Sequence, residues 1–447
     1  MNNPTTPSVA LVTLGCAKNL VNSEQMLALL VGAGFFVAPE VDGADVAVIN
    51  TCGFIDAAKR EAIDTILEAA ELKSAGRLKK IVVAGCLAER YRDEIRAELP
   101  EVDAIVGVGA FGGIVETVRQ VLDGVSVDAT AAPEAFDDDL PRVVSTPKAW
   151  AYIKIADGCD NRCAFCVIPT IRGKYRSRRR ESIVAEARAL AESGVRELIV
   201  IAQDTTRYGV DLYRAPALAE LLRELAEIEE LRWIRVHYMY PDAIDDALID
   251  VFARTPKLLP YFDIPLQHID DAILKNMRRR GDSRLIRDTL SRIRARVPNA
   301  VIRTSLIVGL PGEGDAEFDA LCDFTRESGI ERAGVFVYSP EEGTDAAAMP
   351  RVDEDIAGER AELLERVQSE NIDRFNEARI GERCDVLIEE RLENDEFLAR
   401  SYAESPEIDG YIFVRGEGLQ IGEFCSIIID SVRDGNLVGA PEEDMPA

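Results

Sequence analysis

The sequence predicts an α/β protein with three parts: an N-terminal parallel α/β sheet domain, a central partial (β/α) barrel of six units, and a small C-terminal β-barrel. Short apolar runs alternate with helical patterns in the first part, and the same alternation recurs six times in the second. The third part carries strand-like runs separated by glycine-containing turns. Alternating strands and helices are typical of parallel sheets, whereas strands alone are typical of barrels or sandwiches. The expected domains span residues 7–124, 145–376 and 377–445.

In the N-terminal domain, three apolar runs have the length of short buried strands, and stretches with helical periodicity follow them. The strands are expected at residues 9–14, 45–49 and 80–84, and helices at 23–31 and 57–72 among others. This order predicts a parallel sheet. Residues 124–148 carry Ala, Pro and Asp, including the acidic run 137–139, and are expected to form a loop or linker.

The central region repeats a strand followed by a helix, and six such units favour a partial barrel over a flat sheet. The expected strands are residues 151–155, 197–202, 233–238, 261–265, 301–308 and 334–338, and a helix over 182–192 is expected to stop at Gly194. In parallel barrels the active site lies at the C-terminal ends of the strands. Beyond this region, strands are expected at residues 384–389, 410–415 and 424–432.

Charge and length disfavour several classes of protein. With 80 acidic and 52 basic residues the net charge is −28. This opposes non-specific nucleic-acid binding, which requires Lys and Arg to neutralise phosphates. The acidity suits a basic protein partner, or a surface that serves only solubility. No apolar stretch is long enough to cross a membrane, and the first residues lack the features of a signal peptide, so we expect a cytoplasmic protein without a membrane partner.

The nine cysteines suit that compartment, where clustered thiols indicate metal binding or catalysis rather than disulfides. Only two histidines occur, His237 and His268, which disfavours a mixed Cys/His zinc site and a histidine-based hydrolase. Three cysteines stand singly in apolar contexts and are expected to be buried and inert: Cys322, Cys384 and Cys425. The other six form two groups of three.

The first group is Cys159, Cys163 and Cys166, in the spacing C-x3-C-x2-C. Three thiolates so close can hold three irons of a four-iron cluster and leave the fourth iron open, whereas most iron–sulfur sites use four cysteines. Zinc is disfavoured because it usually needs a fourth Cys or His ligand, and none lies nearby. Since Cys159 follows the first strand of the expected barrel, this group is expected at its mouth.

The second group is Cys16, Cys52 and Cys86, which are far apart in the sequence. Each follows an expected parallel strand and precedes a helix, so all three are expected at the same edge of the sheet, where open α/β folds bind ligands. The alternative is three unrelated buried cysteines in loops, since free cysteine is often simply buried.

The first group, with the aromatic Phe165 before its last cysteine, resembles the signature of radical S-adenosylmethionine enzymes. The resemblance implies that the amino and carboxylate groups of S-adenosyl-L-methionine chelate the open iron, and that its cleavage yields a 5′-deoxyadenosyl radical. It also implies that residues at the strand ends contact this cofactor. The expected contacts are Phe165, Gln203, Arg303 and Gly309.

Two open 4Fe-4S clusters in one chain resemble the radical methylthiotransferases. The resemblance implies an N-terminal methylthiotransferase domain that holds an auxiliary cluster, a radical core and a C-terminal domain of the TRAM type. One branch of this family modifies an adenosine of transfer RNA. The other modifies the β-carbon of an aspartate in the twelfth small-subunit ribosomal protein. Residues 14–24, 263–268, 338–344 and 399–410 resemble the second branch, although Ala17 and Asn22 stand where that branch usually has Pro and Asp.

Charge supports the ribosomal-protein branch. From Gly381 onward there are 17 acidic and 5 basic residues. A TRAM domain that grips RNA should be basic, so an acidic one is expected to dock a basic ribosomal protein. The alternatives are a transfer RNA methylthiotransferase and, from another class, a non-catalytic iron–sulfur electron carrier or scaffold. An electron donor is expected but is not identified by the sequence.

One basic run stands out next to the first cysteine group: Arg172, Lys174, Arg176, Arg178, Arg179 and Arg180. It is a candidate for contact with ribosomal RNA phosphates or with a substrate carboxylate, because Arg pairs bidentately with both. The alternative is a solvated surface loop.

Overall fold

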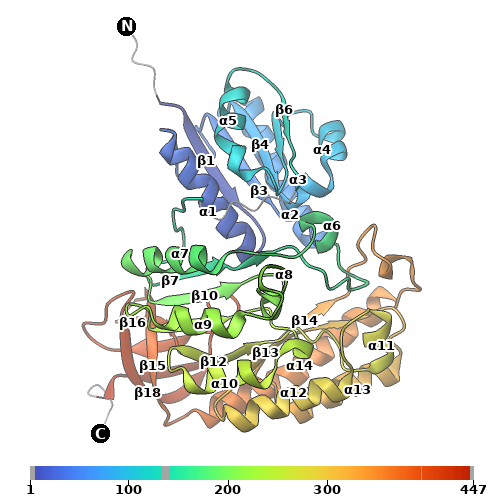
Figure 1. Ribbon diagram of the computed structural model, residues 1–447, viewed down its shortest axis with the longest axis vertical. Helices are drawn as coiled ribbons and strands as arrows, with labels where there is room; N and C mark the ends of the chain where they lie inside the picture. The colour runs from blue at the N-terminus through green and yellow to red at the C-terminus, as the bar shows by residue number, and fades with distance from the viewer. Residues whose placement is uncertain (1–5, 133–139, 394, 443–447) are drawn as a thin grey trace.

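The computed structural model describes residues 6–132, 140–393 and 395–442, so the acidic run 137–139 lies outside the described residues. Figure 1 shows the N-terminal sheet at one end of the molecule, the central sheet with its outer helices at the other, and the C-terminal barrel packed beside the central sheet. The predicted α/β class is confirmed. In the described part of the chain, no helix has the length and apolar character needed to cross a membrane.

The N-terminal sheet consists of parallel strands in the order β2-β1-β3-β4-β5-β6. Its strands are β1 (Ser8–Thr13), β2 (Phe36–Ala38), β3 (Val46–Thr51), β4 (Lys80–Gly85), β5 (Ala104–Val106) and β6 (Val127–Ala129). Its helical elements are α1 (Ala17–Gly32), α2 (Asp56–Ser74), α3 (Cys86–Arg90), α4 (Arg92–Glu98), η1 (Phe111–Gly113) and α5 (Ile114–Leu122). The three predicted strands are confirmed. The linker prediction is wrong over β6, which pairs with β5.

Helices cover both faces of this sheet, so its strands are buried on both sides. Alternate residues of β3 enter opposite cores: Val48 packs in the cluster that contains Met26 of α1, and Ile49 in the cluster that contains Ile66 of α2. Each fully buried aliphatic side chain of this kind stabilises the fold by about 1.5–3 kcal/mol. Such burial explains why the strands appear in the sequence as continuous apolar runs.

The central sheet is parallel and open, in the order β14-β13-β12-β11-β10-β7, which confirms the partial barrel of six strands. Its strands are β7 (Trp150–Lys154), β10 (Glu197–Ile201), β11 (Trp233–Val236), β12 (Leu258–Asp263), β13 (Val301–Val308) and β14 (Arg332–Val337). The α-helices of this region are α6 (Ile168–Arg172), α7 (Arg180–Glu192), α8 (Val210–Tyr213), α9 (Leu218–Ala226), α10 (Asp246–Arg254), α11 (Asp271–Asn276), α12 (Ser283–Arg296), α13 (Asp315–Ser328) and α14 (Glu354–Ala378). Short elements are β8 (Ala156–Asp157), β9 (Arg176–Ser177), η2 (Thr205–Arg207), η3 (Pro241–Ala243) and η4 (Ala346–Ala348).

The C-terminal part is a closed barrel in the order β15-β16-β17-β19-β18, as predicted for a small β-barrel. Its strands are β15 (Arg383–Arg391), β16 (Glu396–Arg400), β17 (Ile412–Arg415), β18 (Phe424–Arg433) and β19 (Asn436–Ala440). Sequence patterns did not predict β16 and β19, which are short strands of five residues each.

A buried ionic chain joins this barrel to the central sheet. Glu197 of β10 accepts hydrogen bonds from Arg235 of β11 at 2.9 Å and from Arg400 of β16 at 2.7 Å, and all three side chains are fully buried. On the same face of the central sheet, α1 packs against β7, and Val21, Trp150 and Leu387 of the barrel share one apolar cluster. The three parts therefore share buried contacts.

Candidate functional site

Cys159, Cys163 and Cys166, here called the loop triplet, lie between β8 and α6 at the C-terminal side of β7. Backbone hydrogen bonds hold this loop, from Cys159 N–H to the carbonyl of Gly173 at 3.1 Å and from Cys166 N–H to the carbonyl of Cys163 at 3.1 Å. Gly158 has a φ of +79°, and a β-carbon there would lie 2.1 Å from the carbonyl oxygen of Lys174. Only glycine fits this close approach of two backbone segments.

The thiols of the loop triplet are shielded from water. The pKa of Cys159 is raised to about 11, chiefly by burial; a hydrogen bond from the Asn161 N–H opposes this rise and the charge of Asp204 adds to it. Burial and the neighbouring Cys163 raise the pKa of Cys166 well above its usual value. Arg279 donates a hydrogen bond to the Cys163 sulfur at 3.4 Å. Without a bound metal, the thiols of Cys159 and Cys166 keep their protons at neutral pH, and a metal that binds takes the place of those protons.

Cys16, Cys52 and Cys86, here called the sheet triplet, follow β1, β3 and β4. A β-carbon on Gly15 would lie 2.7 Å from the Cβ of Cys52, so the first two loops touch. Burial, then the charges of Cys86 and Cys16, raise the pKa of Cys52 to about 12. The fold thus brings together three cysteines that are far apart in the sequence.

Asn19 connects the loops that carry the sheet triplet. Its amide donates hydrogen bonds to the carbonyls of Leu14 at 3.1 Å and Thr51 at 2.9 Å, beside Cys16 and Cys52. Its carbonyl oxygen lies 3.7 Å from the sulfur of Cys86. Asn19 is fully buried, so these bonds are sheltered from competition by water.

Cys16 differs from its partners because it is exposed to solvent, whereas Cys52 and Cys86 are buried. Desolvation by the surrounding protein still acts on its thiol and by itself would raise its pKa. The nearby charges of Lys18 and Arg172 and hydrogen bonds from backbone N–H groups outweigh this effect, so the pKa of Cys16 is lowered. A lowered pKa favours the thiolate, the form that binds metal.

Each triplet has a donor set that fits a four-iron cluster with one open iron. Within the described residues, no three Cys, His, Asp or Glu side chains are close enough together to hold a single metal ion. A cluster holds its thiolates further apart than a single ion does, because each thiolate binds a different iron. The arrangement therefore disfavours a mononuclear site and is compatible with a cluster at each triplet.

Arg172 lies between the two triplets. Its guanidinium pairs with the carboxylate of Asp157 at 3.0 Å, two residues before Cys159, and donates to the sulfur of Cys86 at 3.4 Å. It also donates to the side-chain oxygens of Asn19 and Asn22. We call these contacts the Arg172 bridge; they link α1 and α3 of the N-terminal sheet to the loop triplet.

Several arginines of the basic run therefore form ion pairs with carboxylates of the protein itself. Arg172 and Arg178 are each 2% exposed, and Arg178 pairs with Glu186 at 2.5 Å. Arg180 pairs with Glu224 at 3.0 Å. The interpretations of this run as an RNA-contacting surface or a solvated loop are wrong for Arg172 and Arg178, because buried guanidinium groups already bonded to carboxylates cannot reach phosphates.

The four expected cofactor contacts lie around the C-terminal side of the central sheet. Gln203 follows β10, and its amide donates to Asp157 at 2.9 Å while its buried carbonyl oxygen has no hydrogen-bond partner in the described residues. Arg303 of β13 pairs with Asp263 at the end of β12 at 3.0 Å. Phe165 packs in the apolar cluster of Met277 and Leu310, and Gly309 follows β13 with a φ of +74°.

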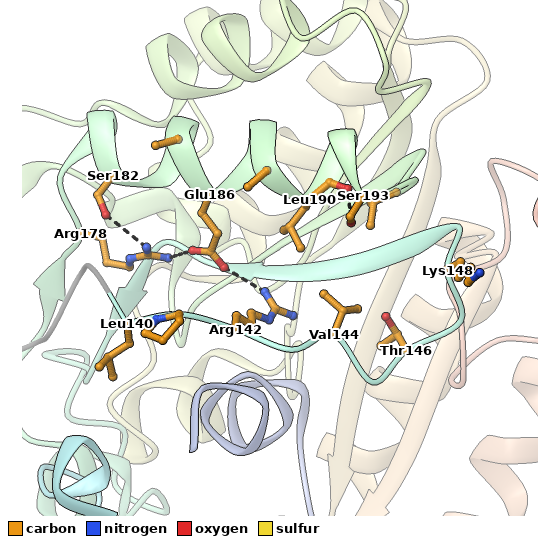
Figure 2. Close-up of a pocket in the computed structure, with 14 residues that line it drawn as sticks. Leu140, Arg142, Val144, Thr146, Lys148, Arg178, Ser182, Glu186, Leu190 and Ser193 are labelled. Carbon is orange, nitrogen blue, oxygen red and sulfur yellow. Dashed lines mark hydrogen bonds and ion pairs between the residues drawn. The ribbon is translucent and has the colours of Figure 1, made fainter. Parts of the chain in front are cut away.

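A cavity of about 550 Å³ lies elsewhere, between residues 140–148 and α7 (Figure 2). None of the six grouped cysteines lines it. Figure 2 shows three of its charged groups directed at one another: Glu186 pairs with Arg178 at 2.5 Å and with Arg142 at 3.0 Å. Because these groups are already satisfied, we place the chemistry at the two triplets rather than here.

Family models match three parts of the chain. They are "Uncharacterized protein family UPF0004" at residues 8–107, "Radical SAM superfamily" at 153–325 and "TRAM domain" at 380–441. The chain is 44% identical over 96% of its length to the ribosomal protein uS12 methylthiotransferase RimO of Clostridioides difficile, of which the alignment covers 98%. It is 45% identical over 98% of its length to RimO of Symbiobacterium thermophilum, covering 91% of that protein.

The chain belongs to the RimO methylthiotransferase family. Family membership makes it an enzyme that transfers methylthio groups, and the radical core implies a 4Fe-4S cluster and S-adenosylmethionine as cofactors. The non-catalytic carrier is therefore excluded. Among solved structures, it resembles the radical S-adenosylmethionine methyltransferase TsrM of Kitasatospora setae, with a TM-score of 0.55 and 15% identity, covering 75% of this chain and 74% of that chain. This likeness supports the fold alone.

Sequence reasoning missed several residues that surround the triplets in this RimO family member. Arg279 contacts Cys163 from 116 residues away, and the local sequence gives no signal of that contact. Asp157 could have been noticed, because it lies two residues before Cys159 and a buried carboxylate needs a cationic partner. Lys154, with its amine 2.9 Å from Asp157, could have been noticed as a charge within an apolar strand.

Proposed function

We propose that this protein transfers a methylthio group to the β-carbon of an aspartate in ribosomal protein uS12. The observation that carries the proposal is the Arg172 bridge, since it ties a thiol of the sheet triplet to the start of the loop triplet. Radical formation and sulfur delivery must occur next to each other for one carbon to undergo both. Near-full-length identity to RimO proteins supports uS12 as the substrate.

In this proposal the two triplets have different tasks. Cys159, Cys163 and Cys166 hold the cluster that works with S-adenosylmethionine, and Cys16, Cys52 and Cys86 hold an auxiliary cluster. When bound, these groups supply a radical able to remove hydrogen from an unactivated C–H bond and a sulfur atom for insertion. The chain itself buries four of the six thiols, holds the loops through Asn19 and Gly158, and links the two triplets through Arg172.

We also propose that Phe165, Gln203, Arg303 and Gly309 contact S-adenosylmethionine. The unpartnered carbonyl oxygen of Gln203 supports this role, because a buried acceptor without a donor costs free energy until a ligand supplies one. Gly309 supports it differently. A β-carbon at this position would lie 2.7 Å from Cβ of Ala357, so only glycine, which has no side chain, fits where the backbone turns after β13.

The division into domains at 7–124, 145–376 and 377–445 is part of the proposal, supported by the three family matches. The acidic C-terminal barrel is proposed to dock basic uS12 by charge complementarity. The same acidity argues against the transfer RNA alternative, since RNA binding requires cationic groups. An electron donor, not yet identified, completes the partners, and the cytoplasm, where ribosomes assemble, is the proposed location.

Mass spectrometry of uS12 tests the proposal. In a strain that lacks this protein, the aspartate is expected to have lost its methylthio group, and reintroducing the wild-type gene is expected to restore it. A methylthio mark that persists in the deletion strain would contradict the proposal. Loss of methylthio-adenosine from transfer RNA in that strain would support the alternative substrate instead.

A further inference from the structure

Lys18 is a buried cation without an anionic partner. It lies in the first turn of α1, two residues after Cys16, and is 6% exposed. Its ammonium nitrogen lies 3.1 Å from the centre of the Tyr238 ring. Within residues 6–132, 140–393 and 395–442, the structure gives this nitrogen no hydrogen bond and no ion pair. An aromatic face compensates only part of the cost of removing an ammonium from water, so the position suits an anionic ligand.

The ammonium lies where the two halves of the site meet. Tyr238 follows β11 at the C-terminal side of the central sheet, and its N–H donates to the carboxylate of Asp263 at 2.9 Å. The positive charge of Lys18 acts on both Cys16 and His237. Lys18 therefore stands between the sheet triplet and the mouth of the partial barrel.

The carboxylate beside Tyr238 does not pair with Lys18. Asp263 is the nearby carboxylate, and it already pairs with Arg303 at 3.0 Å. His237 carries no charge at neutral pH, because burial lowers its pKa to about 3. The Cys16 thiol, on which the charge of Lys18 also acts, is proposed to bind iron, so the ammonium remains able to pair with an incoming carboxylate.

We propose that Lys18 binds the side-chain carboxylate of the substrate aspartate and so positions its β-carbon. This inference rests on the proposed function. In aspartate the carboxylate carbon is bonded directly to the β-carbon, so an anchor on the carboxylate holds the reacting carbon one bond away. That carbon then lies between the sheet triplet, from which sulfur comes, and the barrel mouth, at which hydrogen is removed. Lys18 would also select aspartate over asparagine, because the amide lacks the charge.

Equilibrium binding tests this role without turnover. Purified uS12 is titrated into cluster-loaded, unreduced enzyme with S-adenosylmethionine present, alongside a uS12 variant that carries asparagine at the modified position. Wild-type enzyme is expected to bind native uS12 at least about tenfold more tightly than this variant. Lys18→Gln is expected to bind both forms equally, and Lys18→Arg to keep part of the preference because it keeps the charge.

Matched controls separate this role from a structural one. Lys275→Gln removes an exposed lysine on α11 and is expected to keep the full preference. The iron content of each Lys18 variant is compared with that of wild type before binding is measured. If Lys18→Gln loses iron, the binding preference is measured instead with Lys18→Met, which keeps the length and apolar stem of the side chain. With native uS12 under turnover, the Lys18 variants are expected to release 5′-deoxyadenosine with little methylthiolated product.

Three outcomes would overturn the inference. An equal preference for aspartate in wild type and Lys18→Gln would show that Lys18 does not contact the substrate carboxylate. Weaker binding of S-adenosylmethionine with unchanged binding of uS12 would assign Lys18 to the cofactor instead. If wild-type enzyme gives no methylthiolated uS12 at all, the proposed function fails and the inference fails with it; product formation with an unaltered preference overturns the inference alone.

Discussion

The two cysteine triplets bring three thiols together in different ways. The loop triplet lies within eight residues of one loop, whereas the sheet triplet gathers the ends of three strands spread over 71 residues. Each has an arginine that donates to one of its sulfurs at 3.4 Å, Arg279 to Cys163 and Arg172 to Cys86. Arg279 belongs to the same central region as its cysteine. Arg172 reaches across from the central region to the N-terminal sheet.

This difference indicates which structural feature the environment of each triplet depends on. The environment of the loop triplet comes from its own loop and the central sheet, so it depends on local backbone geometry. The environment of the sheet triplet depends on how the N-terminal sheet docks against the radical core. A useful readout is the ratio of methylthiolated uS12 to 5′-deoxyadenosine, because it separates the use of the radical from its formation.

Removing the thiols has the largest expected effect. Replacing Cys159, Cys163 and Cys166 by Ala should abolish both 5′-deoxyadenosine and product, because no radical forms. Replacing Cys16, Cys52 and Cys86 by Ala should abolish product but leave 5′-deoxyadenosine formation. Each triple variant should lose about four of about eight irons, the content of two cubane clusters. Iron analysis and chromatography measure these outcomes; equal loss of 5′-deoxyadenosine in both variants would contradict the division of tasks.

The glycines beside each triplet test the role of backbone geometry. In Gly158→Ala the new β-carbon would meet the backbone carbonyl oxygen of Lys174, which cannot move aside as a side chain can. The strain should cost about 3 kcal/mol and deplete iron from the loop triplet. Gly15→Ala would press on the side chain of Cys52 and deplete iron from the sheet triplet instead. Gly32→Ala, in open space within α1, is the control and should be neutral or stabilising by up to about 1 kcal/mol.

Breaking the Arg172 bridge should affect the sheet triplet more than the loop triplet. Arg172→Gln leaves buried acceptors on Asn19 and Asn22 without their donor, which should cost about 2–3 kcal/mol in denaturant unfolding. The ratio of product to 5′-deoxyadenosine should fall by more than tenfold, or about 1.4 kcal/mol. Arg180→Gln, which breaks a partly exposed pair, should change stability by less than about 1 kcal/mol. An unchanged ratio in Arg172→Gln would show that docking does not depend on this side chain.

The smallest expected effect concerns a second contact between the N-terminal sheet and the core. Glu341 pairs with Arg90 at 2.6 Å and with Lys59 at 3.1 Å, and its side chain is 2% exposed. Glu341→Gln keeps the shape and part of the hydrogen bonding, so we expect a loss of about 1 kcal/mol and a ratio lowered only a few-fold. Glu342→Gln, next to it, contacts Arg90 only through its backbone and serves as the control. A larger loss for Glu341→Gln than for Arg172→Gln would reverse this order of importance.

The parts of the fold that sequence patterns missed are short. Strands β2, β5 and β6 have three residues each, and β16 and β19 have five. Three residues show too little periodicity to distinguish an edge strand from a loop, which explains why β6 was assigned to the linker. The long buried strands, such as β3 and β13, carried continuous or alternating apolar residues and were predicted close to their observed bounds.

The sequence by itself determined the three-part α/β architecture and the spacing of the loop triplet, because both depend on residues near one another in the chain. The shared edge of Cys16, Cys52 and Cys86 also followed from sequence, through the rule that parallel strands end on one side. Only the tertiary structure decided that Arg172 is a buried bridge, that Arg279 contacts Cys163, and that Lys18 faces Tyr238 without an anion. Burial and charge pairing depend on groups brought together by packing, and local sequence does not encode which distant segment supplies the partner.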